Sequence, residues 1–149
     1  MKIIFYIFTI FPLKPAFFLW DTLFKVLPLN ILRLMPPFRV TKTNLSIAFP
    51  GLAKHELDLL AKESYKETLK SFYETLFTWS RSSKKIIRET KRINNRFLFN
   101  SQEKESGLII FALHNRSIDF LLRWISSQRP HTSLYKKIKL KPIDKFVKK

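Results

Sequence analysis

The chain has 149 residues, which is enough for one well-cored domain and too short for two. It contains no cysteine and only two glycines, so disulfides, thiolate metal sites, a cysteine nucleophile and the usual glycine-rich phosphate loops are excluded. Its formal net charge of +17 points to an anionic partner, whether nucleic acid, an anionic membrane surface or an acidic protein.

Residues 1 to 35 are apolar with few charges, and we expect them to form a helical membrane-anchoring segment. A spanning helix needs about 20 apolar residues in a row, whereas Pro12, Pro15 and Pro28 interrupt this stretch. We therefore expect an embedded or interfacial anchor that is broken by prolines. A secretory signal is disfavoured because no cleavage site of small residues follows. A buried hydrophobic hairpin of helices is the alternative.

Residues 36 to 53 are expected to form a connector with a short helix, closed by a Pro50-Gly51 turn. Residues 54 to 80 carry the clearest helical signal, because apolar side chains recur at steps of three and four residues. These side chains are Leu57, Leu60, Ala61, Tyr65, Leu69, Phe72, Leu76 and Trp79. We interpret this stripe as a core-facing surface. The basic segment that follows, residues 81 to 105, is either a solvated amphipathic face or an anion-binding surface.

Residues 108 to 113 form an unbroken apolar run that follows Gly107 and precedes polar residues. A short apolar run without alternation is typical of a strand that is buried on both faces of a parallel or mixed sheet. Residues 120 to 125 are predicted to be helical, with Ser117 as the N-cap. The order strand, turn, helix predicts an α/β fold. It places His114 at the carboxyl end of the strand, where open α/β sheets bind ligands.

His114 and Asp119 flank that turn, and a chain that folds back there can bring the carboxylate to the imidazole ring. The carboxylate would fix the ring tautomer and stabilise the imidazolium that forms when the other nitrogen takes a proton. Such a pair is a general base able to deprotonate a substrate hydroxyl. Arg116 in the same turn is a candidate for holding a phosphate or a phosphopantetheine. The alternative is a histidine that only caps the strand and an aspartate that only begins the helix.

Three stretches have counterparts in one known family. Arg39 to Leu52 carries Asn-Leu and Phe-Pro after its basic residues, ahead of the long helix, and the apolar run leads into His114 and Asp119. Tyr135 and Lys136 open a Tyr-Lys-Lys stretch that Pro-Ile-Asp follows. Together they resemble the N-terminal half of the lipid A biosynthesis acyltransferases, the late lauroyl and myristoyl transferases of Gram-negative bacteria. The third stretch is only loosely similar to the family's Tyr-Arg-Pro…Leu-Asp.

The resemblance implies an enzyme that moves a fatty acyl chain from acyl carrier protein to a hydroxyl of a lipid A precursor. It implies His114 as the general base, Asp119 as its orienting acid, and Arg116, Tyr135 and Lys136 as substrate-binding residues. Neither a metal nor another cofactor is implied, and the three scattered histidines also disfavour a metal site.

The resemblance further implies two parts, a hydrophobic membrane-anchoring segment at 1–35 and a partial acyltransferase domain at 36–149. The second part would hold a truncated sheet like that of the glycerolipid acyltransferases, with flanking helices. The implied location is the cytoplasmic face of the inner membrane. Acyl carrier protein, a phosphorylated lipid A precursor and anionic membrane lipids are the implied partners, and all three suit a chain with a net charge of +17.

Two departures from the family leave alternatives open. Where the family has Gly-Asn-Trp-Glu, residues 116–119 read Arg-Ser-Ile-Asp, which is closer to the His-x4-Asp of the broader glycerolipid acyltransferases. The family also continues beyond the resemblance, so a truncated, inactive copy is one alternative. A non-catalytic, membrane-associated basic protein is another. A nucleic-acid-binding module would explain the charge, but no RNP, helix-turn-helix or zinc signature is present, and no nucleic acid is expected as a partner.

Overall fold

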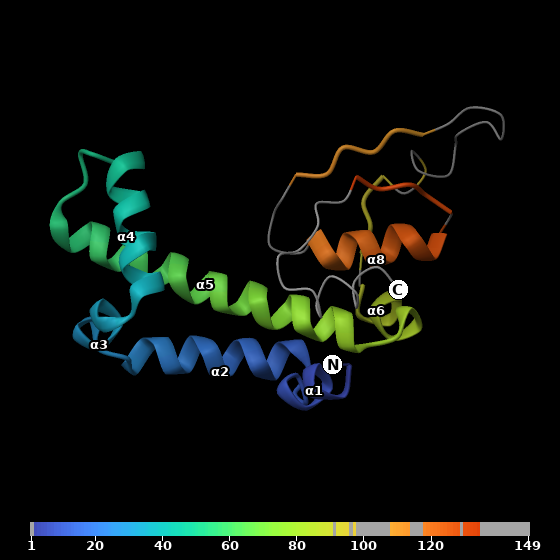
Figure 1. Ribbon diagram of the computed structural model, residues 1–149, viewed down its shortest axis with the longest axis horizontal. Helices are drawn as coiled ribbons and strands as arrows, with labels where there is room; N and C mark the ends of the chain where they lie inside the picture. The colour runs from blue at the N-terminus through green and yellow to red at the C-terminus, as the bar shows by residue number, and fades with distance from the viewer. Residues whose placement is uncertain are drawn as a thin grey trace.

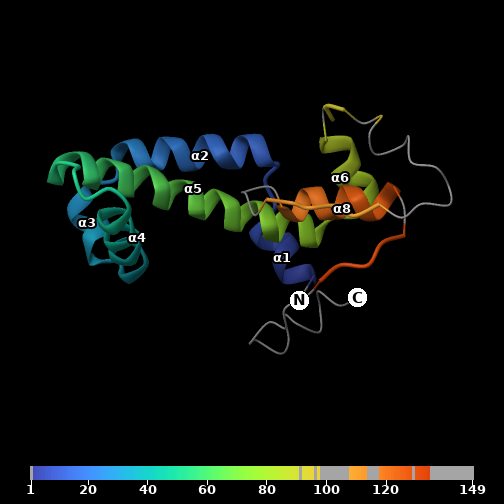
Figure 2. The same cartoon turned by 90° about the horizontal axis from the view of Figure 1, so that it is seen from above.

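The computed structural model describes residues 2–90, 92–95, 97, 108–113, 118–128 and 130–134. Within this part of the chain the elements are α1 (Lys2–Phe8), α2 (Leu13–Val26), α3 (Leu29–Leu34), α4 (Pro36–Ala48), α5 (Lys54–Ser80), α6 (Ser83–Glu89) and α8 (Ile118–Gln128). Figure 1 shows α5 as the long axis of the molecule, with α2 running beside it in the opposite direction. Figure 2 confirms that α3 and α4 lie at one end of α5, whereas α1, α6 and α8 lie at the other.

The predicted α/β fold with a sheet is wrong for this part of the chain, in which all regular structure is helical. Residues 108–113, the predicted strand, have no regular secondary structure. Ile109, Phe111 and Leu113 are 81%, 94% and 84% exposed instead of buried. A strand covered on both faces needs neighbouring strands and flanking helices, and the described residues supply no strand to pair with it. Within the described residues, the apolar run therefore has the local pattern of a strand but no strand to pair with.

The apolar membrane anchor predicted for residues 1–35 is also wrong as an element of the fold, because the helices of this stretch are short and pack along α5. The expected interruption by prolines is confirmed. Pro12 and Pro28 stand immediately before α2 and α3. The fixed φ and missing N–H of proline suit the start of a helix and oppose its interior. The resulting helices have 7, 14 and 6 residues, whereas a span needs about 20. Over the described residues, no helix has both the length and the apolar character needed to cross a bilayer.

The predicted long helix is confirmed as α5, which spans 27 residues from Lys54 to Ser80. The backbone N–H of Ala53 donates to Oε2 of Glu56 at 3.1 Å, so an acidic side chain satisfies one free donor where the helix begins. The short helix expected in the connector is confirmed as α4, and the helix expected around residues 120–125 is confirmed as α8. All three carried a local signal of periodicity or capping.

The hydrophobic core lies where α2, α3 and α4 meet the first half of α5. Its buried side chains are Phe24, Leu32, Phe38, Ala61 and Tyr65. The Tyr65 ring lies between two phenylalanines, with ring centroids 6.2 Å from Phe24 and 5.9 Å from Phe38. Aromatic pairs at such separations add to the free energy gained by burial. The first 35 residues thus contribute to the core, although α1 and α2 also leave large apolar side chains in solvent.

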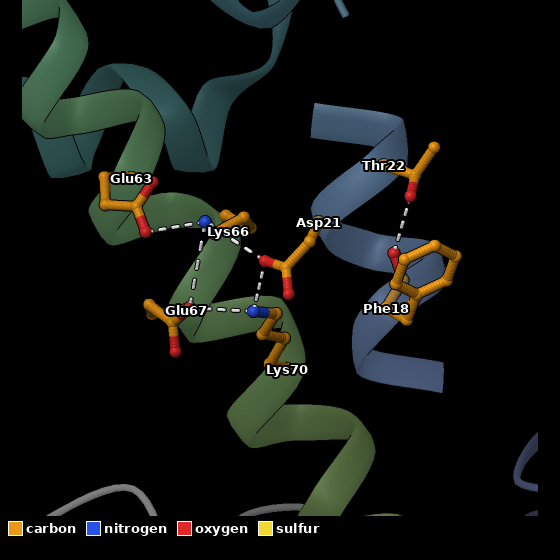
Figure 3. A network of polar contacts seen from close by, with 7 residues as sticks. All are labelled: Phe18, Asp21, Thr22, Glu63, Lys66, Glu67 and Lys70. Atoms are coloured by element: carbon orange, nitrogen blue, oxygen red, sulfur yellow. Dashed lines mark hydrogen bonds and ion pairs between the residues drawn. The ribbon is translucent and has the colours of Figure 1, made fainter. Parts of the chain in front are cut away.

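Ion pairs link α5 to α2. Asp21 of α2 accepts a hydrogen bond from Lys70 and lies 3.2 Å from Nζ of Lys66, both on α5 (Figure 3). Lys70 also pairs with Glu67 at 3.1 Å, and Lys66 with Glu63 at 2.6 Å. The hydrogen bond from Lys70 is the main reason that the pKa of Asp21 lies below its usual value. The two pairs made by Asp21, with Lys66 and Lys70, fix the register of α2 along α5.

Candidate active site

Asp119 is the predicted site residue that the structure describes, and its carboxylate is held by α5. It lies in the first turn of α8 and is half-buried. The hydroxyl of Thr75 donates to Oδ2 at 2.6 Å, and the indole Nε1–H of Trp79 donates to Oδ1 at 3.1 Å. Thr75 and Trp79 are four residues apart on α5, so they share one face of that helix. Each carboxylate oxygen therefore has its own donor from a neighbouring element.

The position of α8 follows from its own sequence pattern. Trp124 and Ile125 are buried, and the helix packs against α5 and α6. Its strongly sided distribution of apolar residues turns one face toward those helices. An acidic residue in the first turn of a helix is favoured by the helix dipole, which agrees with the place of Asp119. Packing and two hydrogen bonds together fix the direction of the Asp119 carboxylate.

An open cavity of about 510 Å³ lies beside the start of α8, where α2, α5 and α8 approach one another. Its lining is mainly apolar, with charged side chains among the apolar ones. The lining residues are Leu13, Lys14, Phe17, Glu74, Glu89, Thr90, Arg92, Ile93, Phe120, Leu121 and Trp124. Glu74 is only 5% exposed and precedes Thr75 on α5. A mainly apolar cavity with a few charged groups has the features of a small-molecule site, although Asp119 and its donors Thr75 and Trp79 do not line it.

The other predicted site residues, His114, Arg116, Tyr135 and Lys136, lie outside the described residues. The pairing of His114 with Asp119 therefore stays a prediction, as do the substrate contacts of the other three. An ionised carboxylate has roughly four acceptor positions. The two hydrogen bonds from α5 thus leave the Asp119 carboxylate able to accept a further donor, such as an imidazole N–H.

Sequence reasoning missed the two residues that hold Asp119. Trp79 was assigned to the core-facing stripe, and Thr75 was not singled out. The available signal was the indole N–H of Trp79, because a buried tryptophan usually needs an acceptor. No acceptor could be chosen from the sequence alone, since Asp119 lies 40 residues further along the chain.

The comparisons with known proteins place the chain in a family. A family model described as bacterial lipid A biosynthesis acyltransferase matches residues 9–149. No significant match was found among curated proteins or among solved structures. Because the match extends over almost the whole chain, the resemblance seen in the sequence is confirmed, and the chain belongs to the bacterial lipid A biosynthesis acyltransferase family.

Proposed function

We propose that this protein transfers a fatty acyl chain from acyl carrier protein to a hydroxyl of a lipid A precursor. Family membership gives acyl transfer in lipid A biosynthesis as the general activity. The observation that carries the proposal is the Asp119 carboxylate, which donors from α5 hold in place at the start of α8. A fixed carboxylate five residues after a histidine suits a general-base pair better than it suits a solvent-exposed helix cap.

The proposed reaction needs one proton transfer in each direction. His114 takes the proton of the acceptor hydroxyl as its oxygen attacks the thioester carbonyl carbon. Asp119 accepts a hydrogen bond from the other ring nitrogen and stabilises the imidazolium. When the carbon–sulfur bond breaks, the imidazolium returns the proton to the departing phosphopantetheine thiolate. The products are the acyl ester and the free thiol of acyl carrier protein, so charges and protons balance.

Substrate binding is proposed to use basic residues. Arg116 would hold a phosphate of the acceptor or of the phosphopantetheine, and Tyr135 and Lys136 would contact the acceptor. The acidic acyl carrier protein and the phosphorylated acceptor both suit a protein with a net charge of +17. We propose the cytoplasmic face of the inner membrane as the site of action, because anionic lipids there attract basic proteins.

Transfer from acyl-loaded carrier protein to a lipid A precursor, measured with the purified full chain, tests the proposed activity. We expect His114→Ala to lower kcat by about 10²- to 10⁴-fold, the usual value of a general base. Exposed His55→Ala is the matched control and should retain the wild-type rate. Wild-type turnover no faster than that of His114→Ala would show that the protein is not an acyltransferase of this kind.

A further inference from the structure

The Asp119 carboxylate on α8 is held by side chains of another helix, which are not part of the proposed pair of His114 and Asp119. Both of its hydrogen-bond donors, Thr75 and Trp79, come from α5. Neither donor belongs to the stretch that resembles the acyltransferase histidine-acid site. The Thr75 bond, at 2.6 Å, has the length that is normal for a hydroxyl donor to a carboxylate.

Resting on the proposed function, we infer that Thr75 and Trp79 are positioning residues, which hold the Asp119 carboxylate in the orientation that the acyl transfer requires. One donor alone would leave the carboxyl group free to rotate about its terminal torsion. Two donors, one on each oxygen, fix both the position of the group and the plane in which it lies. The carboxylate is then already oriented for its third hydrogen bond, the one to the general base, and loses no further rotational freedom during the reaction.

The geometry of α5 makes this arrangement stiff. The two donors lie one helical turn apart, and the turn between them includes buried Phe77 and Thr78. The hydroxyl of Thr78 donates to the carbonyl oxygen of Glu74, so it is used within α5 itself. Thr75 differs, because its hydroxyl reaches across to α8. The same helix thus provides a threonine that binds Asp119 and others that do not.

The test compares variants that each remove one donor. Thr75→Val removes the hydroxyl and Trp79→Phe removes the indole N–H, while Thr75→Ser keeps a hydroxyl. Thr68→Val is the matched control, because the exposed Thr68 hydroxyl donates to the Ser64 carbonyl oxygen on the same helix. Trp20→Phe controls for the loss of an indole elsewhere, since half-buried Trp20 packs against the core.

We expect Thr75→Val and Trp79→Phe to lower kcat by about 10- to 100-fold with little change in KM for acyl carrier protein, since misplacing a reacting group by about 1 Å can cost that much. Thr75→Ser should recover most of the rate, and both controls should keep it. A merely structural role would instead lower the unfolding temperature and leave the kcat of the folded enzyme unchanged. That result, with Asp119→Asn still impaired, would overturn the inference and leave the proposed function standing.

A second measurement does not require turnover. The chain has three histidines, so the imidazole signal of His114 can be assigned by substitution and followed by NMR as the pH is changed. A nearby carboxylate favours imidazolium, so Asp119→Asn should lower the titration midpoint of His114 by about one pH unit. Thr75→Val and Trp79→Phe should move the midpoint in the same direction, and Thr68→Val should not.

The titration midpoint of His114 tests the positioning role of Thr75 and Trp79 separately from the proposed acyl transfer. If the wild-type protein shows no transfer, the proposed function fails, and the His114 midpoints decide the positioning inference by themselves. Midpoints that move in Thr75→Val and Trp79→Phe would support it. Midpoints that stay in place in both variants, or that do not respond even to Asp119→Asn, would overturn it.

Discussion

The charge of Asp58 on α5 binds two further helices, α3 and α4. Its side chain is 3% exposed, and its carboxylate accepts hydrogen bonds from Lys42 of α4 and, at 2.7 Å, from Arg33 of α3. Burial by itself would raise the pKa of Asp58, but the hydrogen bonds from Lys42 and Arg33 outweigh it and hold the pKa below 3.8. One buried carboxylate on α5 therefore secures two of the helices that complete the core.

We expect Asp58→Asn to lower the free energy of unfolding by about 1 to 3 kcal/mol at neutral pH, because two charged donors lose their acceptor. Because the pKa of Asp58 is lower in the folded state, its contribution to the free energy of unfolding is present at pH values above the usual aspartate pKa. This contribution is lost as the pH falls through the pKa of the folded state. Urea unfolding of both proteins between neutral and acidic pH measures this. Glu63→Gln, at a 62% exposed side chain, is the control and should change stability by less than about 0.5 kcal/mol. If the free energies of unfolding of the wild type and Asp58→Asn differed by the same amount at all pH values, the ionised Asp58 carboxylate would not be the source of the stabilisation.

At the scale of elements, α1 is attached to the end of α5 by a buried polar cluster. Thr9 is fully buried and its hydroxyl lies 3.1 Å from that of Ser80. Nη2 of Arg81 donates to the carbonyl oxygen of Thr9 at 2.5 Å. The Arg81 guanidinium also stacks 3.8 Å from the centroid of the Tyr6 ring and 4.7 Å from that of Phe77. A planar cation with several donors is suited to both roles at once.

We expect Arg81→Lys to loosen α1 although the charge is kept. An ammonium group cannot stack as a planar guanidinium does, and it has a single nitrogen in place of the two that bond the Thr9 carbonyl oxygen and the Ser80 hydroxyl. The cost should be about 1 to 3 kcal/mol, typical of a lost buried hydrogen bond to a charged group. Hydrogen exchange should show faster exchange in α1 and little change in α4. Arg88→Lys on the exposed face of α6 serves as the control. Unchanged exchange in α1 would mean that its contacts do not depend on Arg81.

The elements also show how far the sequence could be interpreted. The bounds of α5 were predicted from apolar spacing, because a long amphipathic helix is specified by local periodicity. The prolines ahead of α2 and α3 were noticed as interruptions, but they act as starts for new helices. Residues 108–113 were assigned to a strand because a strand pattern does not reveal whether a partner exists. Asp119 was found as a candidate, whereas its donors Thr75 and Trp79 depend on tertiary packing that no local pattern contains.

At the scale of the whole molecule, strong positive charge accompanies an unusual amount of exposed apolar surface. The net charge is +17, and α1 and α2 expose large side chains such as Ile7, Phe8, Phe18 and Leu19, each at least 60%. Helices that lie on a bilayer place exposed apolar side chains among the headgroups and basic residues near anionic lipids. Together these features support the proposed location at an anionic membrane surface, without a spanning helix among the described residues.

We expect the full chain to cosediment with vesicles containing anionic phospholipid and to bind at least about tenfold more weakly to purely zwitterionic vesicles, since each basic residue near an anionic surface contributes about 1 kcal/mol. Raising the ionic strength from about 0.1 to 0.5 M should weaken the binding because salt screens the charges. Equal binding to both vesicle types would argue against the role of charge. Preference for duplex DNA over anionic vesicles would instead favour the nucleic-acid alternative.

The length of α5 has a consequence for how the protein can vary. At a rise of 1.5 Å per residue, Asp58 and Thr75 lie about 25 Å apart along α5. Groups at that separation with no shared neighbours contribute independently, so their mutational effects add. The α3–α4 end can therefore accumulate changes that weaken or strengthen the fold while the far end keeps its acid in place. Selection can therefore change the stability of this protein and its chemistry separately, although both depend on the same helix.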